Sequence, residues 1–219
     1  GTINVSGGDL ALGAVNIDST TVLDLDGDNN SLTYDSFNDG TSGGNLTVNT
    51  EGGFNLNNST NIGNGNLSIN IDTNNNGTET LVVSISPRAS SIVYNGSAAS
   101  NDFLTGPNSN TTWTITTGNT GTLAENSFTN FANLTGGTLN DTFTFSGTGA
   151  LTGLLDGGAH NSGDTADYSA LGVQTIDLGG NAGGVTRIEN ITGNTNQTLL
   201  GAANNQSWTI SGADDGNVV

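Results

Sequence analysis

The sequence contains no cysteine and no methionine, and its only fixed positive charges are Arg88 and Arg187. Against 20 acidic residues they leave a formal net charge of −18. A chain with so few cations cannot neutralise phosphates, which excludes nucleic acid and anionic membrane surfaces as partners. The charge instead favours metal cations such as Ca²⁺. The lack of cysteine is typical of an extracellular bacterial protein that does not rely on disulfides.

Residues that favour α-helices are also scarce. Lysine is absent and glutamate is rare, while glycine, asparagine and threonine are abundant. These abundant residues disfavour helix interiors. No apolar run approaches the roughly 20 residues needed to span a bilayer. Short runs of β-branched and aromatic residues, separated by glycine and asparagine, predict an all-β protein of many short strands joined by tight turns.

One strand pattern recurs in the first half of the chain. The segment GNLTVN at residues 44–49 returns as GNLSIN at residues 65–70, 21 positions later. Apolar residues occupy alternate positions in both, so one face of each strand is expected to point inward. A repeat of this length predicts a parallel β-solenoid of about ten coils, with inward asparagine ladders at its turns. A β-sandwich is the alternative fold, although its strands need not repeat a sequence pattern.

The second half contains a longer repeat. Residues 101–123 match residues 196–218 at a constant offset of 95 positions, which aligns Trp113 with Trp208, the only tryptophans. We therefore expect solenoid coils with a repeat of about 21 residues over 1–89. A continuing solenoid over 90–219 would hold one full long repeat and the start of the next. We interpret the chain as a piece of a longer repetitive protein, or a processed product of one.

Several motifs of this region are similar to those of a known class. They are WTI, NLTGG, NDTF, LDGG and DTADYS, which begin at Trp113, Asn133, Asn140, Leu155 and Asp164. Together they resemble the repeats of giant secreted bacterial surface proteins, the filamentous-haemagglutinin-like and RTX-like adhesins with β-strand repeats. The resemblance covers residues 90–219, and residues 1–89 resemble the more generic strand repeats of the same proteins. It implies a β-solenoid shaft at the cell surface and says little about a ligand.

The densest acidic cluster is a candidate calcium site. Asp24, Asp26 and Asp28 alternate along the chain, and Asp35 follows Asp24 by eleven positions. Alternate carboxylates followed by a later acid are similar to a calcium-binding loop. Asn29 replaces the glycine of that motif, and Asp35 replaces its glutamate. The alternative is a solvated strand edge whose charges prevent pairing with another strand.

Two further aspartates, Asp141 and Asp164, lie in degenerate versions of another calcium motif. Residues 136–144 resemble the β-roll nonapeptide G-G-x-G-x-D-x-U-x, with Leu139 in place of a glycine, and residues 157–165 form an interrupted copy. Such sites need consecutive stacked nonapeptides, which the chain does not supply. The favoured alternative is that both aspartates accept hydrogen bonds from turn amides.

Catalytic chemistry finds little support in the sequence. His160 stands alone in a glycine-rich turn, and ligation of a metal is expected to need a second histidine or a cysteine. A nucleophile elbow, a phosphate-binding loop and a cysteine nucleophile are all missing. A polysaccharide lyase would need cationic groups, and a glycosidase would need paired carboxylates. The alternating threonines do not recur at one spacing in every coil, as an ice-binding array would require.

These observations predict a structural or adhesive segment of an extracellular bacterial surface fibre or adhesin shaft, without catalytic or cofactor-binding residues. Calcium is the one candidate cofactor. The expected partners are neighbouring repeats, copies of the same chain, and host or cell-surface glycans. One alternative is a self-assembling filament or surface-layer subunit stabilised by calcium. A second alternative is a β-helix enzyme that acts on carbohydrates.

Overall fold

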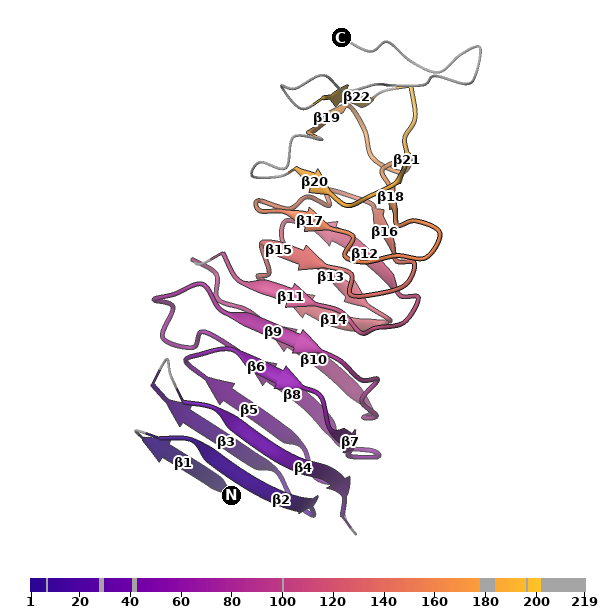
Figure 1. Ribbon diagram of the computed structural model, residues 1–219. Helices are drawn as coiled ribbons and strands as arrows, with labels where there is room; N and C mark the ends of the chain where they lie inside the picture. Colours follow the sequence, from indigo (N-terminus) through magenta and orange to yellow (C-terminus); the bar gives the residue numbers. More distant parts are fainter. Residues whose placement is uncertain are drawn as a thin grey trace.

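The protein is a parallel β-solenoid, as predicted, and the β-sandwich alternative is wrong. The computed structural model describes residues 1–6, 8–27, 30–40, 43–99, 101–177, 184–195 and 197–201. These residues form about 8 stacked turns without a helix. Figure 1 shows the coils stacked along one axis, with the N-terminal coil at the bottom of the view. Within the described ranges, no helix is long and apolar enough to cross a membrane.

In the described ranges the strands belong to four sheets, which form the faces of the solenoid. The largest sheet has eleven strands, in spatial order β1 (Thr2–Ser6), β3 (Thr21–Asp26), β5 (Leu46–Thr50), β8 (Asn66–Asn70), β10 (Ser91–Asn95), β14 (Asn126–Thr129), β13 (Thr120–Leu123), β12 (Thr112–Thr117), β16 (Thr142–Phe145), β18 (Thr165–Asp167) and β21 (Asn190–Thr192). The second sheet has six strands, β20 (Val185–Thr186), β17 (Leu155–Asp156), β15 (Asn133–Thr135), β11 (Phe103–Thr105), β9 (Thr80–Val83) and β6 (Phe54–Leu56). The third contains β2 (Leu10–Ile17), β4 (Leu32–Asp39) and β7 (Ser59–Asn61), and the fourth contains β19 (Gln174–Asp177) and β22 (Gln197–Leu200).

Alternation along each strand builds the core, because successive side chains point to opposite faces. On β5 the side chains of Leu46 and Val48 are buried, whereas the intervening Thr47 is half-buried. Parallel pairing in register then stacks the buried residues of neighbouring coils into columns. One column of the eleven-stranded sheet consists of Leu23, Val48, Ile69, Tyr94 and Phe128. The facing column of the six-stranded sheet consists of Phe54, Leu81, Leu104, Leu134, Leu155 and Val185.

The length of a coil varies more than the sequence predicted. Leu46 and Leu67, the matching residues of the GNLTVN and GNLSIN segments, are paired across β5 and β8 at the expected spacing of 21 positions. Other coils range from 20 residues, between the paired Thr2 and Val22, to 34 residues, between the paired Tyr94 and Phe128. The longer coils explain why the described residues form about 8 turns instead of ten.

Asparagine side chains do form a ladder along the stack, but not in the predicted orientation. The amide of Asn70 donates to Oδ1 of Asn49 at 2.7 Å, and the amide of Asn95 donates to Oδ1 of Asn70 at 2.7 Å. The hydroxyl of Thr129 continues the ladder with a 2.8 Å bond to Asn95. All four side chains are half-buried on the outward face of the eleven-stranded sheet. The strands place them there because each is one position away from an inward apolar residue.

A three-stranded meander interrupts the parallel order of the large sheet, and the sequence patterns did not predict it. Strand β13 pairs antiparallel with both β12 and β14. Three strands of the eleven-stranded sheet therefore lie between β10 and β16, whereas the six-stranded sheet has only β15 between β11 and β17. One face of the solenoid is consequently longer by two strand spacings, roughly 10 Å.

Large aromatic side chains fill the core beside this meander. The ring of Trp113 stacks on Phe143 with the centroids 5.4 Å apart and meets the edge of Phe128 at 6.1 Å. Phe131 packs against Phe128 in turn, and all four rings are fully buried. Trp113 is therefore a packing anchor of the core. Its sequence match, Trp208, lies outside the described residues.

Candidate functional site

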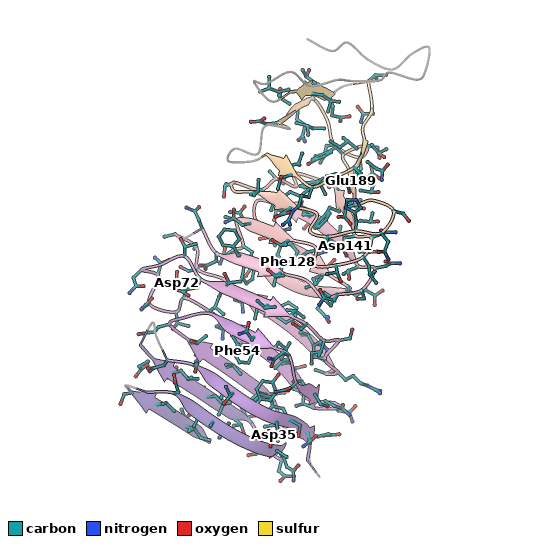
Figure 2. All side chains as sticks on the ribbon, viewed as in Figure 1. Asp35, Phe54, Asp72, Phe128, Asp141 and Glu189 are labelled. Carbon is teal, nitrogen blue, oxygen red and sulfur yellow. The ribbon has the colours of Figure 1, made fainter. Side chains whose placement is uncertain are left out.

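Three acids occupy one corner of the coils that contain β16, β18 and β21. Asp141, Asp164 and Glu189 are the residues that immediately precede strands β16, β18 and β21. These strands pair in register, which stacks Thr142, Thr165 and Asn190 and therefore also stacks the residues before them. We call Asp141, Asp164, Glu189 and the nearby His160 the acidic corner. Figure 2 shows Asp141 and Glu189 on the same side of the upper coils.

Each acid of the corner accepts a hydrogen bond from the backbone of the preceding coil. The N–H of Thr111 donates to Oδ1 of Asp141 at 3.0 Å, and the N–H of Asp141 donates to Oδ1 of Asp164 at 2.7 Å. The N–H of Asp164 donates to Oε2 of Glu189 at 2.8 Å. The structure therefore contains the amide contacts expected for Asp141 and Asp164, except that the amides belong to the neighbouring coil.

The second oxygen of each buried aspartate has no hydrogen-bond partner. Oδ2 of Asp141 and Oδ2 of Asp164 are both inaccessible to solvent, and the two residues are 1% and 0% exposed. Each oxygen lies against a glycine. A Cβ atom on Gly136 would lie 2.4 Å from Oδ2 of Asp141, and one on Gly157 would lie 2.6 Å from Oδ2 of Asp164. Only glycine leaves room for these carboxylates.

Burial and repulsion by neighbouring carboxylates disfavour ionisation of this pair. Burial, followed by the charge of Asp164, raises the pKa of Asp141 to about 7, and the hydrogen bonds from Thr111 oppose that shift. Burial also raises the pKa of Asp164, while its bond from Asp141 acts in the opposite direction. The pair thus lies at a corner where a compensating positive charge would stabilise the ionised form.

His160 provides a nitrogen ligand at this corner. Its Nδ1 atom is 3.1 Å from Oε2 of Glu189 and 3.8 Å from Oδ2 of Asp164. In the part of the chain that the structure describes, these three residues form the one group of three metal-binding side chains whose ligand atoms all lie within 4.8 Å of one another. The nearby guanidinium of Arg187 donates to both carboxylate oxygens of Asp156, so the charge of that arginine is already paired.

Sequence reasoning missed this group because two of its members seemed unrelated. His160 is the only histidine, and none of the motifs described in the sequence contains Glu189. The structure instead places Asn190 opposite Thr165, which brings Glu189 above Asp164 at a spacing of 25 residues. The signal that would have found it is the repeated acid before a strand, at the coil length of the upper turns.

The degenerate nonapeptide at residues 136–144 contains two residues with positive φ. Leu139 has φ +71°, a left-handed conformation that is routine only for the glycine found in the motif. The preceding Gly137 has φ +121°. The loop before Asp141 therefore holds a leucine in a backbone conformation that favours glycine. Calcium binding at Asp141 and Asp164 stays a prediction.

The acidic cluster of the first coils is not gathered into one site by the described residues. Asp24 and Asp26 lie on β3 of the eleven-stranded sheet, whereas Asp35 lies on β4 of the three-stranded sheet. Figure 2 shows Asp35 at the N-terminal end of the stack, far from Asp141. Asp28 lies outside the described residues. Calcium binding by these four aspartates stays a prediction.

The upper coils also contain a cavity of about 380 Å³. Its described walls are mainly apolar and include Phe145, Leu155, Tyr168 and Ile176, with Asp177 as the one carboxylate among the described lining residues. Asp177 and Gly184 flank residues 178–183, which lie outside the described ranges. No family model, curated protein or solved structure matches the chain.

Proposed function

We propose that this chain is a non-catalytic structural segment of an extracellular bacterial surface fibre or adhesin shaft, of the filamentous-haemagglutinin-like or RTX-like kind. The observation that carries the proposal is the uninterrupted stack. A single sheet runs from β1 to β21, and it crosses the proline-containing segment 87–91 because β8 pairs directly with β10. A rod of stacked coils transmits force along its backbone hydrogen bonds and holds whatever lies at its ends at a fixed distance.

The polar surface supports the proposal of a soluble spacer whose sides do not bind other proteins. In the described ranges, the large apolar side chains that are exposed are Ile3, Val173 and Leu200. The remaining surface is polar and acidic, in keeping with the net charge of −18. Docking surfaces for proteins or membranes usually present contiguous apolar patches, which three separate residues do not make.

The cavity gives no specific support to the carbohydrate-acting alternative. Hydrolysis of a glycosidic bond normally takes two carboxylates on either side of the sugar. Asp177 is the single acid in the described wall of the cavity. Turnover of any of a broad panel of polysaccharides by the purified chain would replace the structural proposal with the enzymatic one.

The N-terminal end of the stack favours self-assembly as a second candidate function. Strands β1 and β2 are the outermost strands of their sheets, so one edge of each is free of pairing within the described residues. Another coil of the same shape, from a second copy of this chain or from a preceding part of a longer chain, would continue both sheets. Ile3, which is 43% exposed on β1, would then become buried.

Two measurements test the structural proposal. Antibodies raised against the chain should label intact cells of the source organism, and labelling that requires permeabilised cells would overturn the extracellular location. In single-molecule pulling, several copies of the chain linked in tandem should unfold in steps of about one coil, because neighbouring coils contribute separately to stability. Unfolding at forces too low to detect would contradict a mechanical role.

Sedimentation separates the single shaft from the self-assembling subunit. Self-assembly through β1 and β2 predicts species that grow with protein concentration, and Ile3→Lys should reduce them to the monomer. Assembly that is lost on chelation of calcium and restored by its return would favour the calcium-stabilised version. If the protein is a monomer at every concentration, with and without calcium, the self-assembling subunit is contradicted and the adhesin shaft remains as the proposed function.

A further inference from the structure

We propose that His160, Asp164 and Glu189 bind one divalent first-row transition-metal ion, with Zn²⁺ as the probe. The site shares Asp164 with the calcium motifs predicted from the sequence but adds His160 and Glu189, which belong to none of them. It does not depend on the structural role proposed above. Its ligand atoms come from two successive coils, because His160 and Asp164 belong to the turn before β18 whereas Glu189 belongs to the turn before β21. A bound ion would therefore cross-link these two coils.

The distances between the three ligand atoms fit a small metal ion. Bonds of about 2.0–2.2 Å from zinc to nitrogen and carboxylate oxygen place neighbouring tetrahedral ligands about 3.3 Å apart. Nδ1 of His160 is 3.1 Å from Oε2 of Glu189 and 3.8 Å from Oδ2 of Asp164. All three atoms lie within 4.8 Å of one another, so small side-chain rotations suffice to place them around one ion.

Oδ2 of Asp164 points to a missing ligand. The atom is fully buried, lies nearest to His160 among the oxygens of that carboxylate, and has no hydrogen-bond donor. Its partner oxygen, Oδ1, is held by the N–H of Asp141, so the carboxylate cannot turn Oδ2 away without losing that bond. A buried carboxylate oxygen without a donor is costly, and a cation at this position would satisfy it.

The charge around the corner favours a cation. Asp141, Asp156, Asp164 and Glu189 all lie here, and the fixed positive charge of Arg187 is paired with Asp156. The side chains of His160 and Glu189 are 34% and 35% exposed, which opens one side of the corner to solvent. Water on that side would complete the coordination, and an ion could enter from it.

The ligand set selects a transition metal over calcium. Calcium takes six to eight oxygen ligands at about 2.3–2.6 Å, and an imidazole nitrogen is not among its preferred ligands. One imidazole and two carboxylates suit zinc and its first-row neighbours instead.

Calorimetric titration of the untagged, chelator-treated chain with ZnCl₂ tests the proposal. We expect one ion per chain, and we expect His160→Ala and Glu189→Gln each to weaken binding at least about tenfold. The matched control is Glu51→Gln, because Glu51 also accepts a backbone hydrogen bond from the preceding coil, from Gly27, but it has no histidine beside it. This control should bind zinc like the wild type.

Three results would overturn the site. They are the absence of zinc binding, wild-type affinity in His160→Ala, and an equal loss of affinity in Glu51→Gln. Circular dichroism of each variant shows whether it is folded, and His160→Ala replaces a partly exposed side chain, so a folded protein is expected. Competition with CaCl₂ addresses the class of ion, since displacement of zinc by an equal concentration of calcium would contradict a transition-metal site. Substitution by Co²⁺ should give the visible absorption of a tetrahedral nitrogen–oxygen site.

Discussion

The backbone N–H of Asp141 donates a 2.7 Å hydrogen bond to Oδ1 of Asp164, in the next coil of the solenoid. The contact joins two buried acids that are 23 residues apart in the sequence. It satisfies one oxygen of Asp164 and leaves Oδ2 of both residues without a partner. A fold that stacks equivalent positions directly above one another also stacks their charges, and the following prediction depends on the cost of doing so.

Asp141→Asn should stabilise the metal-free protein at pH 8. The asparagine side chain keeps an oxygen that can accept the hydrogen bond from Thr111. It removes the carboxyl group of Asp141, whose pKa is raised from 3.8 to about 7. A raised acid pKa gives stability that is complete below about pH 3.8 and lost as the pH rises through about 7. The advantage of the variant should therefore grow between pH 5 and pH 8 to roughly 1–3 kcal/mol, measured by urea unfolding in the presence of a chelator.

Asp102→Asn provides the contrasting control for that measurement. Both oxygens of the buried Asp102 accept backbone hydrogen bonds, from Glu79 at 2.8 Å and from Ser97 at 2.7 Å. An amide group would turn an N–H towards one of these donors, so this variant should be destabilised. Stabilisation by both substitutions, or by neither, would contradict the assigned difference between the two aspartates.

Asn70→Ala should destabilise the coils that contain β5, β8 and β10. Asn70 is the central member of the asparagine ladder, since it donates to Asn49 and accepts from Asn95. Loss of both half-buried bonds should cost about 1–2 kcal/mol in chemical denaturation. Asn55→Ala is the matched control, because Asn55 is exposed on β6. An equal effect at the two positions would show that the ladder adds nothing to stability.

Asn-Gly in place of Ala124-Glu125 should raise the thermal stability. These two residues join β13 to β14 with φ values of +46° and +72°, the left-handed pair that a type I′ turn requires. Both side chains are exposed, so the exchange relieves backbone strain without removing core contacts. We expect a gain of about 1–2 kcal/mol. Ala98→Gly, in a turn without positive φ, should not stabilise, and a lower melting temperature of the double variant would contradict the turn geometry.

Trp113→Ala should unfold the meander locally before the lower coils. The fully buried indole stacks on Phe143 and meets Phe128, so its removal should cost about 3–5 kcal/mol. Solenoid stability is shared mainly between neighbouring coils. Hydrogen exchange should therefore accelerate in β12, β13 and β14 and stay slow in β5 and β8. Val48→Ala should give the reverse pattern, and uniform loss of protection in both variants would contradict this division.

The sequence by itself determined the fold class through local chemistry. Alternating apolar residues in the segments 44–49 and 65–70, at a spacing of 21, predicted a stacked solenoid, and Leu46 does pair with Leu67. The abundance of asparagine predicted ladders, because an amide can both donate and accept along a stack. These features depend on residues close in sequence, or on an exact repeat, so the chain reveals them without its structure.

Tertiary structure decided the meander and the acidic corner. The turn at Ala124-Glu125 lacks the Asn-Gly or Asp-Gly signal of a tight hairpin. The local sequence therefore did not predict that three strands, β12, β13 and β14, would occupy one coil of the large sheet. Likewise, His160 and Glu189 come within 3.1 Å only because the register sets Asn190 beside Thr165. The coils have unequal lengths, so stacked residues are not separated by a constant number of positions in the sequence. The register is set by backbone pairing between strands, which only the tertiary structure shows.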